Sequence, residues 1–449
     1  MNFKNIIIVL VVFAAITGCE KKLDLAPISA VGDNGFYKNG DEVEGGVIAI
    51  YDGLQQVPLR EFALTEMRSD NSKSKSREGD WAQFEAFTVA PTNQAVGQYW
   101  AANYNVIFRA NVVLENLDSV ETDADRQQFE GEAKFARALA HFNLVRAYGD
   151  VPLIDKVIIQ SDEDYFARVA TSEVLAFIDA DLTSAAVLLP ATNEYGRASA
   201  TAASALLGKV KLTRGDYPGA KTVLEPLVAS GSLEANYSDV FYNEGNSEVI
   251  FAIPYLDDDA NESQDFSYEM TNLGAVSGLN YITDDFKSNL NPDDTIRSPI
   301  LMNPLNENEV GKYLTQSADN RRCGNDWIVL RHADVLLMYA EAIMGAADMT
   351  ADGDAINAYN QVRARAGQSQ LVLGTDDLTK LDLSNERRVE LAFENHRFYD
   401  LMRFGMANSV ISAFATSTGQ SFEPTDLLLP IPQNEINVSA GKLTQNPGY

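Results

Sequence analysis

The chain has 449 residues, of which 45% are hydrophobic, and a formal net charge of −29 at pH 7. This length suffices for one large domain or for two or three smaller ones. The large excess of acidic residues argues against nucleic acid as a partner, because phosphate recognition requires a basic surface.

The first residues have the pattern of a secretory signal. Lys4 precedes an apolar run at 6–16, and a Thr-Gly pair stands directly before Cys19. The run is too short to cross a bilayer, which needs about 20 apolar residues. Small residues before a cysteine are typical of a bacterial lipoprotein signal, so we expect residues 1–18 to be removed and Cys19 to be acylated. An ordinary secretory signal with a chance cysteine is the alternative.

Residues 19–35 form a polar segment that is interrupted by Pro27, Gly32 and Gly35. This composition predicts a tether between a lipid anchor and the folded part of the chain. The other cysteine of the sequence is Cys323. With Cys19 acylated, we expect no intramolecular disulfide and no cysteine-based metal site, so packing must hold the fold.

Helical patterns dominate the sequence from the tether to residue 229. Apolar residues recur at spacings of three and four, as helices that face a core require. The predicted helices span 43–54, 98–117, 132–149, 172–189, 200–215 and 218–229.

The last two of these helices carry the tetratricopeptide spacing, in which small residues mark the place where two helices touch. Gly208 lies in the first helix, and Ala220 and Leu224 follow in the second. A looser helix pair is predicted further along the chain, at 332–344 and 354–367. We therefore predict a helical-repeat scaffold that carries additional segments.

Between residues 230 and 330 the pattern changes. EVIFAIPY at 248–255 predicts a strand, and a long segment rich in Asp, Asn, Ser, Gly and Tyr follows it. An uninterrupted loop of this length in a compact domain is usually functional. LDDDANESQD at 256–265 begins like a calcium loop, but Glu262 stands where an EF-hand needs glycine and Tyr268 where it needs glutamate. We expect no cofactor, with a calcium site of another kind as the open alternative.

The three histidines of the sequence, His141, His332 and His396, are scattered over predicted helices. None of them has the i, i+4 spacing of a helical metal site. We interpret them as packed or capping side chains and predict no metal site.

The most densely charged stretch is NERRVELAFENHRFYDLMRFG at 385–405. On one helix Glu390 and Glu394 would lie one turn apart, with Cβ atoms about 6 Å apart. Retaining glycosidases hold two carboxyl groups about 5 Å apart, so a catalytic pair is one interpretation. However, Arg387 and Arg397 each lie three residues from one of these glutamates.

Apolar residues occur on every side of this predicted helix, which indicates burial on most faces. Buried charges must be paired, and local residues or neighbouring helices can supply the partners. We therefore predict a structural ion network rather than a catalytic site, formed by Arg387, Glu390, Glu394, Arg397, Asp400 and Arg403.

With metal and catalytic sites set aside, binding of a ligand at the surface is the function class that remains. Residues 67–81 are the most basic stretch of this acidic protein. The segment MRSDNSKSKSREGDW carries Lys73 and Arg77 and ends in Trp81. Sugars commonly stack an apolar face on an aromatic ring while their hydroxyls bond to Asp, Asn and Arg. Trp81 is therefore the first candidate aromatic, with a core tryptophan as the alternative, and Trp327 can be either. The basic residues add an acidic glycan as a hypothesis.

Four stretches resemble motifs of the SusD/RagB family of surface lipoproteins from Bacteroidota. They are residues 385–405, GEAKFARALAHFNLVRAYGDVPL at 131–153, RHADVLLMYAEA at 331–342 and the C-terminal PIPQNEINVSAGKLTQNPGY. They follow one another in the family's order behind a lipoprotein signal, and the match covers essentially the whole mature chain. The resemblance implies a mainly α fold built on tetratricopeptide-like units, with long loops and a few short strands.

The resemblance also implies one globular domain at 36–449. It would consist of a helical-repeat part at 36–229, a variable loop-rich insertion at 230–330 and a C-terminal helical part with the family signature at 331–449. Members of the family are binding proteins rather than enzymes, which agrees with the interpretation of residues 385–405 as scaffold.

The implied function is that of a protein lipid-anchored in the outer membrane and exposed at the cell surface. It would capture a nutrient, with an oligosaccharide as the first expectation, and deliver it to a SusC-like TonB-dependent transporter. The alternatives are peptide binding, an envelope scaffold without a small ligand, and a glycoside hydrolase that uses Glu390 and Glu394. By position in the two variable segments, the candidate ligand-binding residues are Asp70, Asn71, Arg77, Trp81, Tyr268, Tyr281 and Trp327.

Overall fold

The computed structural model describes residues 36–75, 79–159, 161–271, 280–314, 317, 319, 321–439 and 441–449. The predicted signal at 1–18, the acylation site Cys19, the tether at 19–35 and Arg77 lie outside these residues. Among the helices that are described, none combines the length and the hydropathy that crossing a membrane requires.

Six helices form the first half of the scaffold, and each packs against the next. They are α2 (Gly40–Gln55), α5 (Gln94–Glu115), α6 (Asp123–Tyr148), α7 (Thr171–Leu188), α8 (Ala200–Thr213) and α9 (Tyr217–Ser230). Their positions confirm the six predicted helices, with ends shifted by a few residues, except at α6, which begins well before its apolar pattern. Side-chain caps mark five of the six starts, all but that of α7. Asn39, for example, accepts a hydrogen bond from the backbone N–H of Glu42, and Thr122 accepts one from that of Asp125.

The predicted tetratricopeptide contact is present between α8 and α9. A Cβ atom on Gly208 would lie 2.4 Å from Cδ2 of Leu224, so the two helices approach this closely because residue 208 is glycine. Ala220 is fully buried beside them. The second predicted pair is α14 (His332–Met344) and α15 (Gly353–Arg365), and α14 also packs against α9. The helical layer therefore continues into the C-terminal part of the chain.

The C-terminal part adds shorter helices beside α14 and α15. They are α16 (Lys380–Glu390), α17 (Arg397–Arg403), α18 (Ala407–Ser417) and α19 (Gln433–Val438). Two short strands, β7 (Met349–Thr350) and β8 (Leu378–Thr379), pair antiparallel and place the start of α16 near the end of α14.

The segment after residue 230 is not one long loop but a series of short elements. The predicted strand is β2 (Val249–Ile253), which pairs antiparallel with β6 (Trp327–Arg331). The other elements are α10 (Asp239–Tyr242), α11 (Phe266–Met270), β3 (Asn280–Ile282), α12 (Asp284–Asn289), α13 (Ser298–Leu301), β4 (Met302–Asn303) and β5 (Asn306–Val310). Elements this short and polar produce no periodic apolar pattern, so the sequence did not predict them.

Long-range pairing joins the stretch at 67–81, which we call the first variable segment, to the insertion at 230–330, the second variable segment. Strand β1 (Ser72–Ser74) pairs antiparallel with β3, which places Lys73 opposite Tyr281. The sheet has the order β1-β3-β5-β4. Helix α11 also rests on α3 (Pro58–Glu66), and α4 (Gly79–Glu85) packs against β1.

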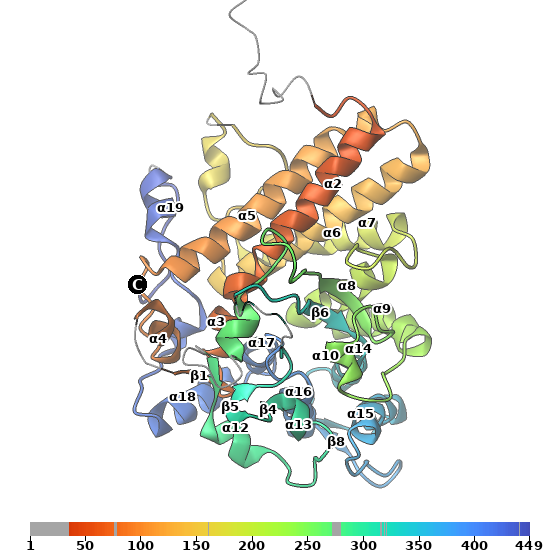
Figure 1. Cartoon of the computed structure of the whole chain (residues 1–449), viewed down its shortest axis with the longest axis vertical. Coiled ribbons are helices and arrows are strands. Elements are labelled where there is room, and N and C mark those ends of the chain that lie inside the picture. Colours follow the sequence, from red (N-terminus) through yellow and green to blue (C-terminus); the bar gives the residue numbers. More distant parts are fainter. Residues whose placement is uncertain are drawn as a thin grey trace, which may run out of the picture.

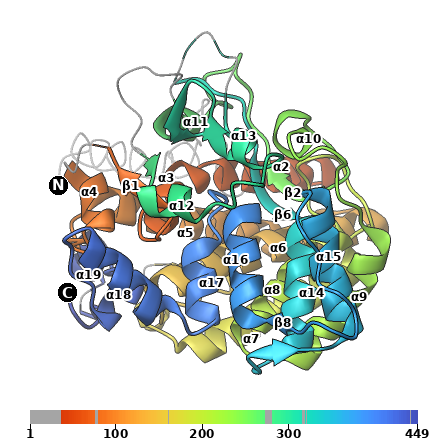
Figure 2. The ribbon, with the colours of Figure 1, turned by 90° about the horizontal axis from the view of Figure 1, so that it is seen from below.

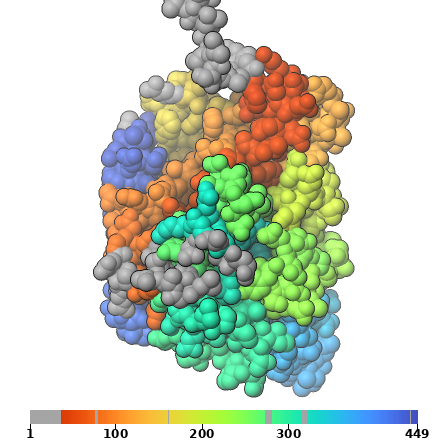
Figure 3. Space-filling view, viewed as in Figure 1, coloured from red at the N-terminus to blue at the C-terminus, as the bar shows by residue number. Residues whose placement is uncertain are grey.

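The molecule has two layers that are visible in the views from the front and from below (Figures 1 and 2). The long helices α5 to α9 and α14 to α17 form one layer. We call the opposite surface the loop face; it consists of α3, β1, α4, α10, α11, β3, α12 and α13. In the space-filling view, green and teal residues of the second variable segment cover the centre and lower part of this face (Figure 3). One continuous apolar core connects the layers, and the mainly α fold class is confirmed.

Candidate functional site

The charged stretch at 385–405 is not one helix. Helix α16 ends at Glu390 and α17 begins at Arg397, and a turn separates them. Phe393 and Asn395 adopt left-handed backbone conformations in this turn, with φ of 66° and 61°. Such conformations interrupt a right-handed helix. The prediction that Glu390 and Glu394 face the same way on one helix is therefore wrong.

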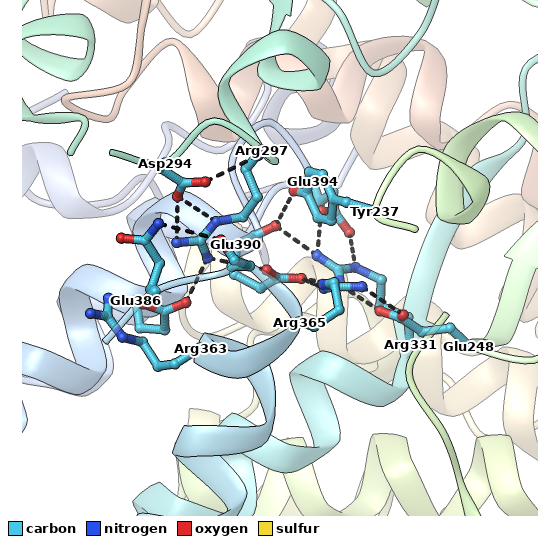
Figure 4. A network of polar contacts seen from close by, with 12 residues as sticks. Tyr237, Glu248, Asp294, Arg297, Arg331, Arg363, Arg365, Glu386, Glu390 and Glu394 are labelled. Atoms are coloured by element: carbon cyan, nitrogen blue, oxygen red, sulfur yellow. Dashed lines mark hydrogen bonds and ion pairs between the residues drawn. The ribbon is translucent and has the colours of Figure 1, made fainter. Parts of the chain in front are cut away.

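Both glutamates are buried in what we call the ion lattice, which comprises Glu248, Arg297, Lys312, Arg331, Arg365, Glu390 and Glu394. Arg331 connects its members, because its Nη1 lies 2.7 Å from Glu390 and 2.8 Å from Glu248 while its Nε lies 2.7 Å from Glu394. Arg297 and Arg365 also pair with Glu390, and Lys312 lies 2.5 Å from Glu394. Figure 4 shows Arg297, Arg331 and Arg365 gathered around Glu390, with Glu248 and Glu394 beside them.

The remaining predicted members of the network are also buried and paired. Arg387 contacts Asp400 and Asp334, each at 2.8 Å, and Arg403 contacts Asp400 and Glu341. The buried ionic network is thus present, and Asp400 pairs with Arg403, three residues further along the chain. The other local pairs are wrong: Arg387 does not pair with Glu390, nor Arg397 with Glu394, because the turn at 391–396 separates α16 from α17.

Other elements supply further partners that the sequence did not predict. Arg297 precedes α13, Arg331 ends β6 and Arg365 ends α15. A local spacing rule cannot find them, although a charged residue next to an apolar run, as in RHADVLLMYAEA, is a usable signal for a buried partner.

Electrostatics exclude acid catalysis at the two glutamates. Burial alone would raise the pKa of Glu394, but Arg331 and Lys312 outweigh it and lower that pKa to about 2. Arg365, Arg331 and Arg297 likewise outweigh burial at Glu390 and hold its pKa well below the usual range. A glycosidase acid needs a raised pKa and access to substrate. These carboxylates have neither, so their role is to hold α16, β6 and α15 together.

Three of the candidate ligand residues lie on the loop face with part of their surface open. Trp81 is half-buried and stacks on Phe62, with ring centroids 5.6 Å apart. Tyr281 is half-buried below Lys75, whose Nζ lies 5.4 Å from the ring centroid. Arg321 lies over Tyr268, with its Cζ atom 4.6 Å from the ring centroid. The β1–β3 pairing thus brings aromatic residues of both variable segments to one surface.

Three other candidates are wrong as surface contacts, because they are packed inside the protein. Asp70 is 2% exposed and holds Arg397 by two hydrogen bonds of 2.8 Å. Asn71 is 0% exposed and accepts a hydrogen bond from Arg388. Trp327 is 2% exposed and stacks on Tyr313. Asp70 and Asn71 therefore fasten the first variable segment to the helical layer rather than contact a ligand.

A cleft of about 690 Å³ lies in the second variable segment, in a position that the sequence analysis did not specify. Tyr242 and Leu256 are 40% and 54% exposed at this cleft, and Glu244, Asp257 and Asn325 add polar groups. Pro299, Ile300, Pro304 and Leu314 contribute apolar walls. The cleft combines an open aromatic ring with hydrogen-bonding groups, as sugar recognition requires.

The side chains that most often bind metal ions are not grouped into a site in the part of the chain that the structure describes. No cluster of three or more His, Cys, Asp or Glu side chains suited to a metal ion occurs there. The three histidines are buried, and burial lowers the pKa of His332 to about 4 and those of His141 and His396 to about 3. They are therefore neutral, packed side chains at neutral pH.

Two family models match separate parts of the chain. The model of the SusD family matches residues 304–449, and a model described as starch-binding associating with outer membrane matches residues 41–212. The first contains the turn at 391–396 and most of the partners of the ion lattice. The second contains the predicted helix series from α2 to α8.

Relatives match over the full length. SusD-like protein P2 of Formosa agariphila is 26% identical, over 98% of each chain, and a SusD-like protein of Bacteroides ovatus is 23% identical, over 85% of this chain and 78% of that one. Among solved structures, a laminarin binding SusD-like protein is 26% identical with a TM-score of 0.77, over 92% of this chain and 100% of that one.

Surface glycan-binding protein A from Bacteroides thetaiotaomicron shares the fold, with a TM-score of 0.78 at 21% identity, over 92% of this chain and 100% of that one. The name of the laminarin binding SusD-like protein describes a binding protein, in agreement with the prediction that the chain is not an enzyme. With the family motifs, the helical scaffold and the full-length relatives in agreement, the chain belongs to the SusD/RagB family.

Proposed function

We propose that this chain is a lipoprotein of the outer membrane that binds a glycan at the cell surface and passes it to a SusC-like TonB-dependent transporter. The observation that carries this proposal is the similarity to the laminarin binding SusD-like protein, which extends over nearly the whole of both chains. No bond is broken in this mechanism. The protein holds its ligand by non-covalent contacts and does not change it chemically.

We assign ligand capture to the loop face. Trp81, Tyr268 and Tyr281 are anchored by packing or by a cation above the ring, while part of each side chain remains open. Rings held in this way lose little conformational entropy when a sugar stacks on them. The cleft beside Tyr242 adds a concave site for the same ligand.

Charge pairing favours a neutral glycan over an acidic one. Lys73 pairs with Asp284, and Arg388 pairs with Asp285 and Asp70. These carboxylates neutralise Lys73 and Arg388, which would otherwise attract an anionic sugar. A neutral glucan such as laminarin is therefore the first ligand to test, and weak dependence of binding on salt is the expected signature.

The test is a binding screen of the mature chain against laminarin, starch, an acidic polysaccharide and a peptide panel, by affinity electrophoresis and calorimetry. We expect laminarin to bind and Trp81→Ala to weaken binding about tenfold, which corresponds to about 1.4 kcal/mol. Phe108→Ala is the matched control, because Phe108 is 50% exposed on α5, away from the loop face. Binding of peptides alone, or of no panel member, contradicts the glycan proposal.

The anchor and the transporter need separate tests. Labelling of cells with a radioactive fatty acid is expected to mark the wild type and to leave Cys19→Ala unmarked. Purification of the labelled protein from solubilised outer membranes is expected to recover a TonB-dependent transporter with it. Recovery of the protein alone contradicts the delivery step and leaves glycan binding to be judged by the screen.

A further inference from the structure

A separate pocket lies on the side of the molecule away from the loop face. It is bounded by the C-terminal ends of α6 and α8, the N-terminal end of α7, and α17, which are remote from α11 and α13 in the view from below (Figure 2). Its volume is about 320 Å³, within the range of small-molecule sites. Val145, Leu175, Met402 and Leu428 give it apolar walls.

One guanidinium group at this pocket is held in a fixed plane. The Cζ atom of Arg146 lies 4.2 Å from the ring centroid of Phe142 and 4.4 Å from that of Tyr399. Its Nε donates to the carbonyl oxygen of Phe142 at 3.3 Å, and its Nη2 donates to Oδ1 of Asn143 at 2.7 Å. Both acceptors are neutral. Stacking therefore fixes the plane of the charge, and Nη1 is left for another acceptor.

The charge of Arg146 is not balanced by a direct partner. Within the described ranges, no carboxylate oxygen lies within 4.0 Å of its guanidinium group. Arg403, which lines the same pocket, differs because Glu341 and Asp400 both bind it. Burial raises the pKa of Glu61 and Arg146 opposes this, but Glu61 accepts a hydrogen bond from Tyr99 instead. Of the two arginines that line this pocket, Arg146 is thus the one without a carboxylate within 4.0 Å among the described residues; it also lines an interior pocket with Glu61 and Lys209.

A second donor lies beside Arg146. Tyr399 lines the pocket and is 7% exposed, and its hydroxyl has no hydrogen-bond partner among the residues that the structure describes. Burial raises the pKa of this hydroxyl, and the opposing effects of Arg146 and Arg68 do not reverse the rise. The hydroxyl therefore stays protonated. A guanidinium group and a hydroxyl group at the end of an apolar pocket form a site for an anion that carries an apolar body.

We propose that this pocket binds a monocarboxylate with a short apolar body, such as a medium-chain fatty acid. Its carboxylate accepts hydrogen bonds from Arg146 and Tyr399, and its body lies against Leu175, Met402 and Leu428. A glycan fits this site poorly, because the walls offer too few partners for its hydroxyl groups. The site is independent of glycan binding at the loop face.

The probe is octanoate, titrated into the mature chain by calorimetry and followed by thermal denaturation. We expect one site per chain with a Kd tighter than about 1 mM, and a higher melting temperature with octanoate because the ligand binds the folded state. Octanol is the neutral comparator and is expected to bind at least about tenfold more weakly, since it cannot pair with Arg146. No saturable octanoate binding, or equal binding of octanol, overturns the proposal.

Two matched variants locate the site without disturbing the core. Thr213 is exposed at the pocket, and its hydroxyl bonds to the carbonyl of Lys209 at 2.9 Å. Thr222 is exposed on α9 and bonds to Pro218 in the same way at 2.9 Å. Thr213→Trp is expected to obstruct the pocket and remove octanoate binding, whereas Thr222→Trp is expected to leave it unchanged.

Arg146→Gln tests the charge directly. We expect octanoate affinity to fall about tenfold while octanol affinity stays the same, a selectivity change that a loss of packing alone would not produce. Octanoate binding that survives in Thr213→Trp places the ligand elsewhere and overturns the assignment.

Discussion

The ion lattice and the loop face use the same charged residue types, but water reaches only one of them. In the lattice, the side chains of Lys312 and Glu394 are both 0% exposed. On the loop face, Lys73 and Asp284 are 32% and 81% exposed and lie 3.4 Å apart. An exposed pair contributes about 0–1 kcal/mol, whereas removing one partner of a buried pair costs about 3–5 kcal/mol. Access to water, rather than residue type, thus decides which charges hold this fold.

The strongest test of this comparison is Glu390→Gln in the lattice. The substitution keeps the shape of the side chain but removes the negative charge that pairs with Arg297, Arg331 and Arg365. We expect the free energy of unfolding to fall by about 3–5 kcal/mol in guanidinium chloride titrations. Glu307→Gln, at an exposed position of β5, is the control and should change stability by less than about 0.5 kcal/mol. A loss below about 1 kcal/mol at Glu390 would show that the lattice does not stabilise the fold.

Acid should remove the stability that the lattice contributes. The folded pKa of Glu394 is about 2, below its ordinary value of 4.5, because Arg331 and Lys312 outweigh burial. Its stabilising contribution is therefore complete above pH 4.5 and is lost as the pH falls toward 2. We expect this group alone to account for about 3 kcal/mol. Stability measured in urea from pH 5 to pH 2 should show the decline, and a flat profile would contradict it.

Glu66 lies between the two regions and should respond to pH in the opposite direction. Burial raises its pKa to about 8, and the backbone N–H of Asn395 offsets this only in part. The folded state holds a proton here that the unfolded chain releases above pH 4.5, so stability falls as the pH rises from 4.5 to 8. We expect Glu66→Gln to be about 3 kcal/mol more stable than wild type at pH 7 and equal to it at pH 4. Equal melting curves at both pH values would refute this.

The smallest effect is expected at the loop face. Asp284→Asn removes the exposed partner of Lys73 and Lys287. We expect a loss below about 1 kcal/mol at low salt that disappears in concentrated sodium chloride. Thermal denaturation at two salt concentrations measures it. A loss above about 2 kcal/mol would mean that this face is braced as the interior is, and the contrast drawn between the two regions would fail.

Local patterns and long-range contacts differed in how well the sequence predicted them. Helix periodicity placed α2, α5, α8 and α9, and the spacing of small residues predicted that α8 and α9 touch at Gly208, where the structure places Leu224. These features depend on residues close together in the chain. The partners of Glu390 come from three separate elements, so only the folded topology brings them together.

Two further features had no usable local signal. Phe393 and Asn395 adopt backbone conformations that are uncommon for residues other than glycine, so the break between α16 and α17 could not be predicted. Asp70 and Asn71 lie in a polar segment that is typical of surface loops, yet both are buried by Arg397 and Arg388. For the proposed ligand site, the sequence indicated segments that reach the surface more reliably than it indicated the exposed residues within them.

The attachment of Asp70 has a consequence for how this protein can change its ligand. Arg397 holds the carboxylate of Asp70, and the hydroxyl of Thr283 donates to its backbone carbonyl at 2.7 Å. The segment is thus fastened at its base, before the chain reaches Ser74. We expect grafts from relatives that keep Asp70 and Thr283 to transfer ligand preference at constant melting temperature. A graft that also replaces Asp70 would remove this attachment. It would change the ligand preference but lower the stability of the fold.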